Sequence, residues 1–296
     1  SQFSLTGSNI VFSRTYALQP DSANFIFTGL DIAFKQTYVL KSDIANFILT
    51  GSPAELKTSR KITANSSSYN LFGAGINFKI FYRLLSAIGS YALSREDANL
   101  IALHVLPLVN GNYTLSGKEI AFKIAHKLLV ELGNYALSGK DIALKTAHKL
   151  SLGTGNYAFT GTAITIKANY ILKATSGNYT FTGTTTQLIS ERKLNLEAGN
   201  YILSGATIAI KYDYLLSPET GNYTLTGTST SFKRTYALKI DSGIFTLSGS
   251  AIAIKAAGRL PIEIGSYALT GNEISIQRAY IISLDGGAFT SSGSPI

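Results

Sequence analysis

The three histidines of the chain are the residues best suited to bind a metal ion, and they are evenly spaced. His104, His126 and His148 follow one another at intervals of 22 residues. Imidazole is a common metal ligand and also titrates near neutral pH. Three rings in one column would form a candidate metal site, or a cluster that gains protons together. The alternative is that histidine replaces tyrosine at one half-buried position of a repeat, since no carboxylates accompany the rings.

Nine lysines follow the same spacing and suggest a surface for anions. Six of them are Lys123, Lys145, Lys167, Lys211, Lys233 and Lys255, and the formal net charge of the chain is +9. A basic surface attracts polyanions, so the row is a candidate polyanion surface with an anionic cell-surface polysaccharide as its partner. The alternative is protection, because positive charge blocks edge-to-edge aggregation of β-strands. Like charges on neighbouring strands are also destabilising.

Catalytic signatures are absent from the sequence. It contains no glycine-rich phosphate loop, no zinc-ligand spacing, no nucleophile elbow and no cysteine. No stretch of about 18 apolar residues could span a membrane as a helix. We therefore expect a protein that is not an enzyme, has no cofactor, does not span a membrane and does not bind a specific nucleic acid.

A 22-residue repeat sets the spacing of all these residues. An aromatic residue falls on every twenty-second position from Phe3 to Phe289, fourteen times without insertion or deletion. A fixed period of this size is typical of repeat architectures. We expect one repeat array over residues 1–296, with thirteen complete units and partial ends, as a segment of a longer fibrous chain.

The other positions of the repeat alternate in polarity. Counting the aromatic residue as position 1, position 3 is Leu or Phe and position 5 is Gly in thirteen of fourteen units. Apolar residues recur at positions 8, 10, 14, 16 and often 18, which is the period of a β-strand. We expect these side chains to point inward, with breaks at position 5, positions 12–13 and positions 21–22. Glycine at a break would supply a positive φ.

These patterns predict an all-β fold. In a β-solenoid, each 22-residue repeat is one rung of three strands, and successive rungs stack at about 4.8 Å. The alternative is a meander of β-hairpins, or a sheet wrapped into a tube, in which equivalent residues lie about 9.6 Å apart. The residues expected to form structural ladders are Tyr113, Tyr135, Tyr157, Tyr179, Tyr201 and Tyr223, with Gly117, Gly139, Gly161, Gly183, Gly205 and Gly227.

The repeat resembles a known type of sequence. The strings at residues 89–94, 133–139 and 265–271 read GSYALS, GNYALSG and GSYALTG. They are similar to 22-residue Tyr-x-Leu-x-Gly arrays in structural proteins of tailed bacteriophages and prophages. The resemblance implies a fibre or tail-associated appendage, and it transfers no catalytic residue.

We therefore expect a structural fibre or filament at a virion surface or outside the cell, in which copies of the chain associate with one another. Alternatives are a bacterial surface adhesin, a self-assembling matrix filament, or a polysaccharide-acting enzyme on a β-helix.

Overall fold

The chain forms two compact units of β-structure. The computed structural model describes residues 2–13, 15–18, 24–42, 46–51, 54–64, 67–73, 75–80, 83–86, 89–94, 97–102, 105–108, 111–130, 132–212, 215–218, 220–234, 237–238, 243–255, 259–262, 265–277, 281–284 and 288–295. The units are residues 1–147 and 148–296, and each is described by itself. All elements of the described residues are strands, so they contain no helix that could cross a membrane.

The first unit contains fourteen of these strands. They are β1 (Gln2–Phe12), β2 (Thr15–Leu18), β3 (Asn24–Ser42), β4 (Asn46–Thr50), β5 (Ala54–Ala64), β6 (Ser67–Phe72), β7 (Gly75–Ile80), β8 (Arg83–Ser86), β9 (Gly89–Ser94), β10 (Asp97–Ala102), β11 (Val105–Leu108), β12 (Gly111–Ile124), β13 (Lys127–Val130) and β14 (Gly133–Thr146).

The second unit contains the remaining fifteen. They are β15 (Lys149–Leu152), β16 (Gly155–Ala168), β17 (Ile171–Ala174), β18 (Gly177–Ser190), β19 (Lys193–Leu196), β20 (Gly199–Tyr212), β21 (Leu215–Pro218), β22 (Gly221–Arg234), β23 (Ala237–Leu238), β24 (Gly243–Ser248), β25 (Ala251–Lys255), β26 (Arg259–Ile262), β27 (Ser266–Gln277), β28 (Ile281–Leu284) and β29 (Ala288–Pro295).

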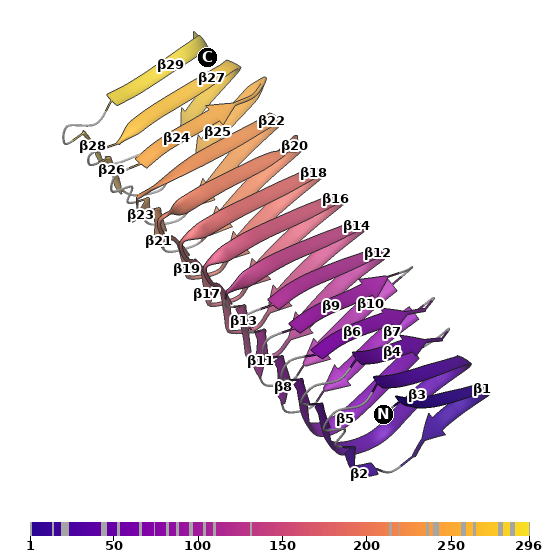
Figure 1. Ribbon diagram of the computed structural model, residues 1–296. Coiled ribbons are helices and arrows are strands. Elements are labelled where there is room, and N and C mark those ends of the chain that lie inside the picture. Colours follow the sequence, from indigo (N-terminus) through magenta and orange to yellow (C-terminus); the bar gives the residue numbers. More distant parts are fainter. Residues whose placement is uncertain are drawn as a thin grey trace. The chain divides into compact units, whose positions relative to one another are not determined.

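Within each unit the strands pair in parallel with equivalent residues of successive repeats. Tyr113 pairs with Tyr135 in the first unit, and Tyr157 pairs with Tyr179 in the second. The rings of both pairs stack with centroids 4.7 Å apart. This distance is one strand spacing, so the predicted β-solenoid is confirmed and the hairpin meander is wrong. Figure 1 shows the strands of each unit side by side in successive rungs.

Each rung has three strand segments, although the first two often join into one long element. In β16 and β18 the ladder pairs Gly161 with Gly183, skips one residue, and resumes at Ala163 with Thr185. The chain turns a corner at this point, and further along the same corner separates β24 from β25. A short third segment, such as β17, completes the rung.

The core is filled by columns of equivalent side chains. In β16 and β17 the buried residues are Tyr157, Phe159, Ile164, Ile166, Ala168, Leu172 and Ala174. They occupy positions 1, 3, 8, 10, 12, 16 and 18 of the repeat. The predicted inward direction of positions 1, 3, 8, 10, 16 and 18 is therefore confirmed for this rung.

The prediction for positions 12 to 14 is wrong. Position 12 continues the strand alternation into the core, where Ile124, Thr146 and Ser190 are buried. The corner falls at positions 13 and 14, so His126 and Tyr170 are exposed. Because two residues at the corner restart the alternation, position 14 faces outward while position 16 faces inward.

The role predicted for the glycines at position 5 is also wrong. Among the described residues a positive φ is recorded for Gly133, at 159° and thus nearly extended. The position-5 glycines are needed because rungs stack closely at this corner. A Cβ atom on Gly183 would lie 2.5 Å from the backbone oxygen of Gly161. Gly139, Gly205 and Gly227 meet the preceding glycine of their column in the same way. Arg95, the exception, lies outside the described residues.

Buried threonine at position 8 gives a prediction about stability. Thr186 is fully buried in a column where Ile164 and Ile208 are its neighbours, and its Oγ1 has no hydrogen-bond partner among the described residues. Burying an unbonded hydroxyl is unfavourable. We expect Thr186→Val to raise the free energy of unfolding by about 1–2 kcal/mol, measured by urea denaturation. The exposed control Thr184→Val should change it by less than about 0.5 kcal/mol; equal effects would contradict the argument.

Candidate functional surfaces

In the second unit, a column inside the core is formed at position 1 by Tyr157, Tyr179, Tyr201 and Tyr223. The ring centroids of Tyr179 and Tyr201 are 4.7 Å apart, and those of Tyr201 and Tyr223 are 4.9 Å apart. Their exposed fractions are 1 to 2%. Offset stacking of aromatic rings adds to the free energy of burial. This column is therefore part of the core and not a surface for ligands.

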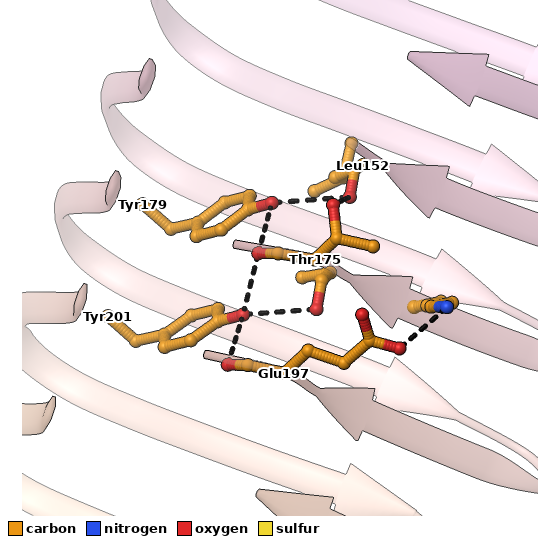
Figure 2. Close-up of polar contacts among 7 residues, drawn as sticks. Leu152, Thr175, Tyr179, Glu197 and Tyr201 are labelled. Carbon is orange, nitrogen blue, oxygen red and sulfur yellow. Dashed lines mark hydrogen bonds and ion pairs between the residues drawn. The ribbon is translucent and has the colours of Figure 1, made fainter. Parts of the chain in front are cut away.

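The tyrosine hydroxyls bind backbone oxygens at the corner that directly precedes each long strand, such as the corner between β17 and β18. The Tyr179 hydroxyl lies 2.7 Å from the oxygen of Gly153, 3.0 Å from that of Thr175 and 3.2 Å from that of Leu152. Tyr201 repeats the pattern one rung later, with the oxygens of Ala174, Thr175 and Glu197. Figure 2 shows both hydroxyls and the corner that they bind.

The same hydroxyls hold successive rungs together. Each carries one hydrogen, so it donates to one carbonyl oxygen at a time. The available acceptors belong to the two preceding rungs: for Tyr179 these are Thr175 in one rung, and Leu152 and Gly153 in the rung before it. Beside them, the ammonium group of Lys173 lies 2.6 Å from the carboxylate of Glu197 in the next rung. Polar contacts at this corner thus fix the register that the apolar columns also require.

Burial keeps these tyrosines neutral. It raises the pKa of Tyr157 and of Tyr179 well above the ordinary value of about 10, because the phenolate would lose its hydration. For Tyr179, hydrogen bonds with Thr175 act in the opposite direction with a smaller effect. A phenol held in its neutral form can donate a hydrogen bond, and it is a poor general base at neutral pH.

Position 14 forms an exposed column of aromatic and basic residues. The His148 and Tyr170 rings stack with centroids 4.8 Å apart and planes inclined by 25°. Arg192, one rung later, places its Cζ 4.5 Å from the Tyr170 centroid and donates a hydrogen bond of 2.7 Å to the Tyr170 hydroxyl. Cation–π contact favours this arrangement. The Tyr170 ring lies between its two neighbours, so neither face is open to a ligand.

The structure does not bring the three histidines into one described site. His104 lies outside the described residues. His126 is an exposed residue of the first unit, and His148 is stacked on Tyr170 in the second. Among the described residues, no group of three or more His, Cys, Asp or Glu side chains is arranged to hold a metal ion.

The predicted lysine row lies on the outside of each unit. Lys123 pairs in register with Lys145 in the first unit, and both side chains are exposed. In the second unit, Lys211, Lys233 and Lys255 occupy consecutive rungs and are also exposed. Lys167 differs, because its ammonium group lies 3.2 Å from the carboxylate of Glu191.

A ladder of asparagine side chains runs along position 22. Asn178 donates its amide hydrogen to the Oδ1 of Asn156 at 3.0 Å, and Asn200 donates to Asn178 at 3.1 Å. In the first unit, Asn134 donates to Asn112 at 3.1 Å. The break expected at positions 21–22 is wrong, because the Gly-Asn pairs begin strands such as β16 and β18 and the break falls at positions 19 and 20. The asparagine ladder was not predicted. The available signal was the fixed position of the asparagine in six repeats.

The glycine corner of the second unit forms a shallow groove of about 810 Å³. Its floor is glycine backbone, because position 5 carries no side chain. Its two sides are columns of small residues at positions 4 and 6, namely Thr226, Ser248, Thr270 and Ser292 on one side and Ala206, Thr228, Ser250 and Asn272 on the other. The lining groups are hydroxyls, amides and backbone, without a charged side chain.

Comparisons of the chain with protein-family models, with curated proteins and with solved structures found no match.

Proposed function

We propose that this chain is a non-catalytic structural repeat protein that contributes to a stiff fibre or filament. The observation that supports this proposal is the in-register ladder within each unit. From β16 to β22, equivalent residues of successive repeats pair along the strands, and the aromatic rings at position 1 stack. A lattice of this kind resists bending and opening, because each rung is held by its two neighbours.

The short corners also support a structural role over an enzymatic one. Glycoside hydrolysis, the reaction considered for a β-helix enzyme, uses a pair of carboxylates beside the scissile bond. The groove along the glycine corner is lined instead by hydroxyl, amide and backbone groups. Repeats of constant length leave few residues from which an asymmetric pocket could be built.

The proposed setting follows from the sequence resemblance. Arrays with the Tyr-x-Leu-x-Gly pattern occur in structural proteins of tailed bacteriophages and prophages, so we place the fibre at a virion surface or outside the cell. Self-association into larger fibres is part of this proposal. A cell-surface adhesin or matrix filament is the second candidate, and the exposed lysine and asparagine columns favour it as surfaces for contact.

Electron microscopy and proteolysis of the purified chain test the structural proposal. We expect filaments or thin particles of uniform width, a 4.7–4.8 Å repeat in diffraction from aligned material, and resistance to a broad-specificity protease. Compact particles that are digested rapidly, or release of sugar from a polysaccharide panel, would contradict it.

A pair of one-residue insertions serves as a control for the ladder. An alanine inserted after Phe181 lies within β18 and turns every following side chain to the wrong face. An alanine inserted after Tyr170 lies at an exposed corner. We expect the first insertion to abolish protease resistance and the second to preserve most of it.

A further inference from the structure

Three lysines of the second unit form a short column of like charge. Lys211 in β20 pairs in register with Lys233 in β22, and Lys233 pairs with Lys255 in β25. All three side chains are exposed. We call Lys211, Lys233 and Lys255 the basic column.

Within the part of the chain that the structure describes, the charges of the basic column are not compensated. No carboxylate of the described residues forms an ion pair with them, whereas Lys167 of the same repeat position has Glu191 at 3.2 Å. Like charges on directly paired residues of neighbouring strands repel each other, and salt and side-chain movement reduce this repulsion. The column therefore adds nothing to the stability of the stack.

A ligand that neutralises the basic column must be extended and anionic. The three ammonium groups repeat along the direction in which the rungs stack, so a linear chain with regularly spaced anionic groups meets them one after another. Lysine supplies point charges on flexible stems, and it does not require a planar, bidentate partner. Carboxylate or sulfate groups along a polysaccharide satisfy this requirement.

The aromatic residues distinguish this ligand from single-stranded nucleic acid. Proteins that bind single strands combine a basic groove with aromatic faces on which the bases stack. In the position-14 column, the exposed ring of Tyr170 lies between His148 and Arg192. Tyr201 and Tyr223, at position 1 of the repeats that contain Lys211 and Lys233, are buried. The described tyrosines at positions 1 and 14 of the second unit thus offer no open face on which a base could stack.

From these observations we propose that the basic column binds a linear acidic polysaccharide, with its anionic groups on Lys211, Lys233 and Lys255. The polysaccharide runs along the stacking direction of the second unit. Binding is electrostatic, so it weakens as the salt concentration rises.

Binding of the full chain to polygalacturonate tests the proposal, with titration calorimetry at low and at physiological salt as the measurement. The key variant is Lys211→Gln with Lys233→Gln. Its matched control is Lys118→Gln with Lys140→Gln, because Lys118 and Lys140 are also exposed lysines of one repeat position in consecutive rungs. Both variants lower the net charge by the same amount.

We expect the column variant to bind at least tenfold more weakly and with a smaller salt dependence, while the control stays within about twofold of the wild type. Dextran, which is neutral, should not bind. An equal loss in both variants would show attraction by net charge alone and overturn the proposal. Tighter binding of oligo(dT), lost in the column variant, would show a nucleic-acid site and overturn it as well.

Thermal unfolding without ligand separates a binding role from a structural one. Because the column is a source of repulsion, the column variant should unfold at the wild-type temperature or slightly above. Polygalacturonate should raise the unfolding temperature of the wild type and leave that of the column variant nearly unchanged. Unfolding of the free variant at a clearly lower temperature would assign the lysines to the fold and contradict the proposal.

Discussion

Replacing Gly183 by valine is expected to lower the free energy of unfolding by about 3 kcal/mol or more. A Cβ on this residue would lie 2.5 Å from the backbone oxygen of Gly161 and 3.2 Å from Cδ1 of Ile164. The oxygen belongs to backbone that is itself paired in the ladder, so it cannot move without separating two rungs. Forcing extra atoms into a packed site costs 1–3 kcal/mol, and more where the neighbours are rigid.

Urea denaturation of the full chain, followed by far-UV circular dichroism, measures this effect. Ala206→Val is the control, because Ala206 lies at the same corner, one residue after a position-5 glycine, with its side chain exposed. The control should change the free energy of unfolding by less than about 0.5 kcal/mol. Wild-type stability of Gly183→Val would show that the rungs separate easily at this corner, and would contradict the geometric argument.

The sequence predicted the stacking of rungs because strand alternation and a fixed period leave few alternatives. Positions 1 and 3 alternate with polar residues in repeats such as the one with Tyr179, Thr180 and Phe181, and no insertion disturbs the repeat. One residue too many would turn the inner face outward. The choice between a solenoid and a meander needed the distance between equivalent residues, which a single repeat does not contain.

The face of position 14 could not be deduced from residue types. Tyrosine and histidine have both apolar and polar parts, so they suit a half-buried strand and an exposed corner equally well. Position 12 gave no clear signal, because it holds residues as different as Ile124, Ser190 and Tyr212. All three are buried. The corner thus lies one residue later than expected, and the faces of positions 12 and 14 are exchanged.

The sequence predicted where the surface columns lie better than it predicted what their residues do. Lysine recurs at position 11, which the strand alternation turns outward, and this pattern predicted the exposed row that includes Lys211 and Lys233. From the sequence alone, the position-5 glycines are explained by their backbone freedom. Their actual role is to leave room for the backbone oxygen of the preceding rung, and this contact becomes apparent only when equivalent residues are stacked. The hydrogen bonds between Asn156 and Asn178 require the same step.

Raising the pH above 10 is expected to unfold the second unit steeply. Burial raises the pKa of Tyr157 and of Tyr179 well above the ordinary tyrosine value, so both remain protonated in the folded chain. In the unfolded chain they ionise near pH 10. Above this pH the folded state therefore binds more protons than the unfolded state, and the stability falls as the pH rises.

The size of this loss of stability follows from the number of protons that the tyrosines release on unfolding. Each such tyrosine lowers the free energy of unfolding by about 1.4 kcal/mol per pH unit above 10, so the pair lowers it by about 2.7 kcal/mol per unit. Two pH units would remove about 5 kcal/mol, which is comparable with the whole stability of many domains. Below pH 10 both states hold these protons, so the pair adds no pH dependence there.

Circular dichroism and absorbance at 295 nm, recorded together from pH 9 to 13, separate the buried phenols from the rest. In the wild type, loss of β-structure and ionisation of the buried tyrosines should coincide, since the phenols ionise when the stack opens. Tyr157→Phe with Tyr179→Phe should be less stable at pH 7 by about 1 kcal/mol for each lost hydroxyl. The loss is no larger at Leu152 because its oxygen still accepts a hydrogen bond from the Thr175 N–H at 2.9 Å. The same variant should nevertheless lose stability less steeply above pH 10.

Tyr170→Phe, which removes an exposed hydroxyl, should follow the wild-type profile. If the rings ionise while the circular dichroism is unchanged, the column is open to solvent, and its place as the closed centre of the stack is wrong.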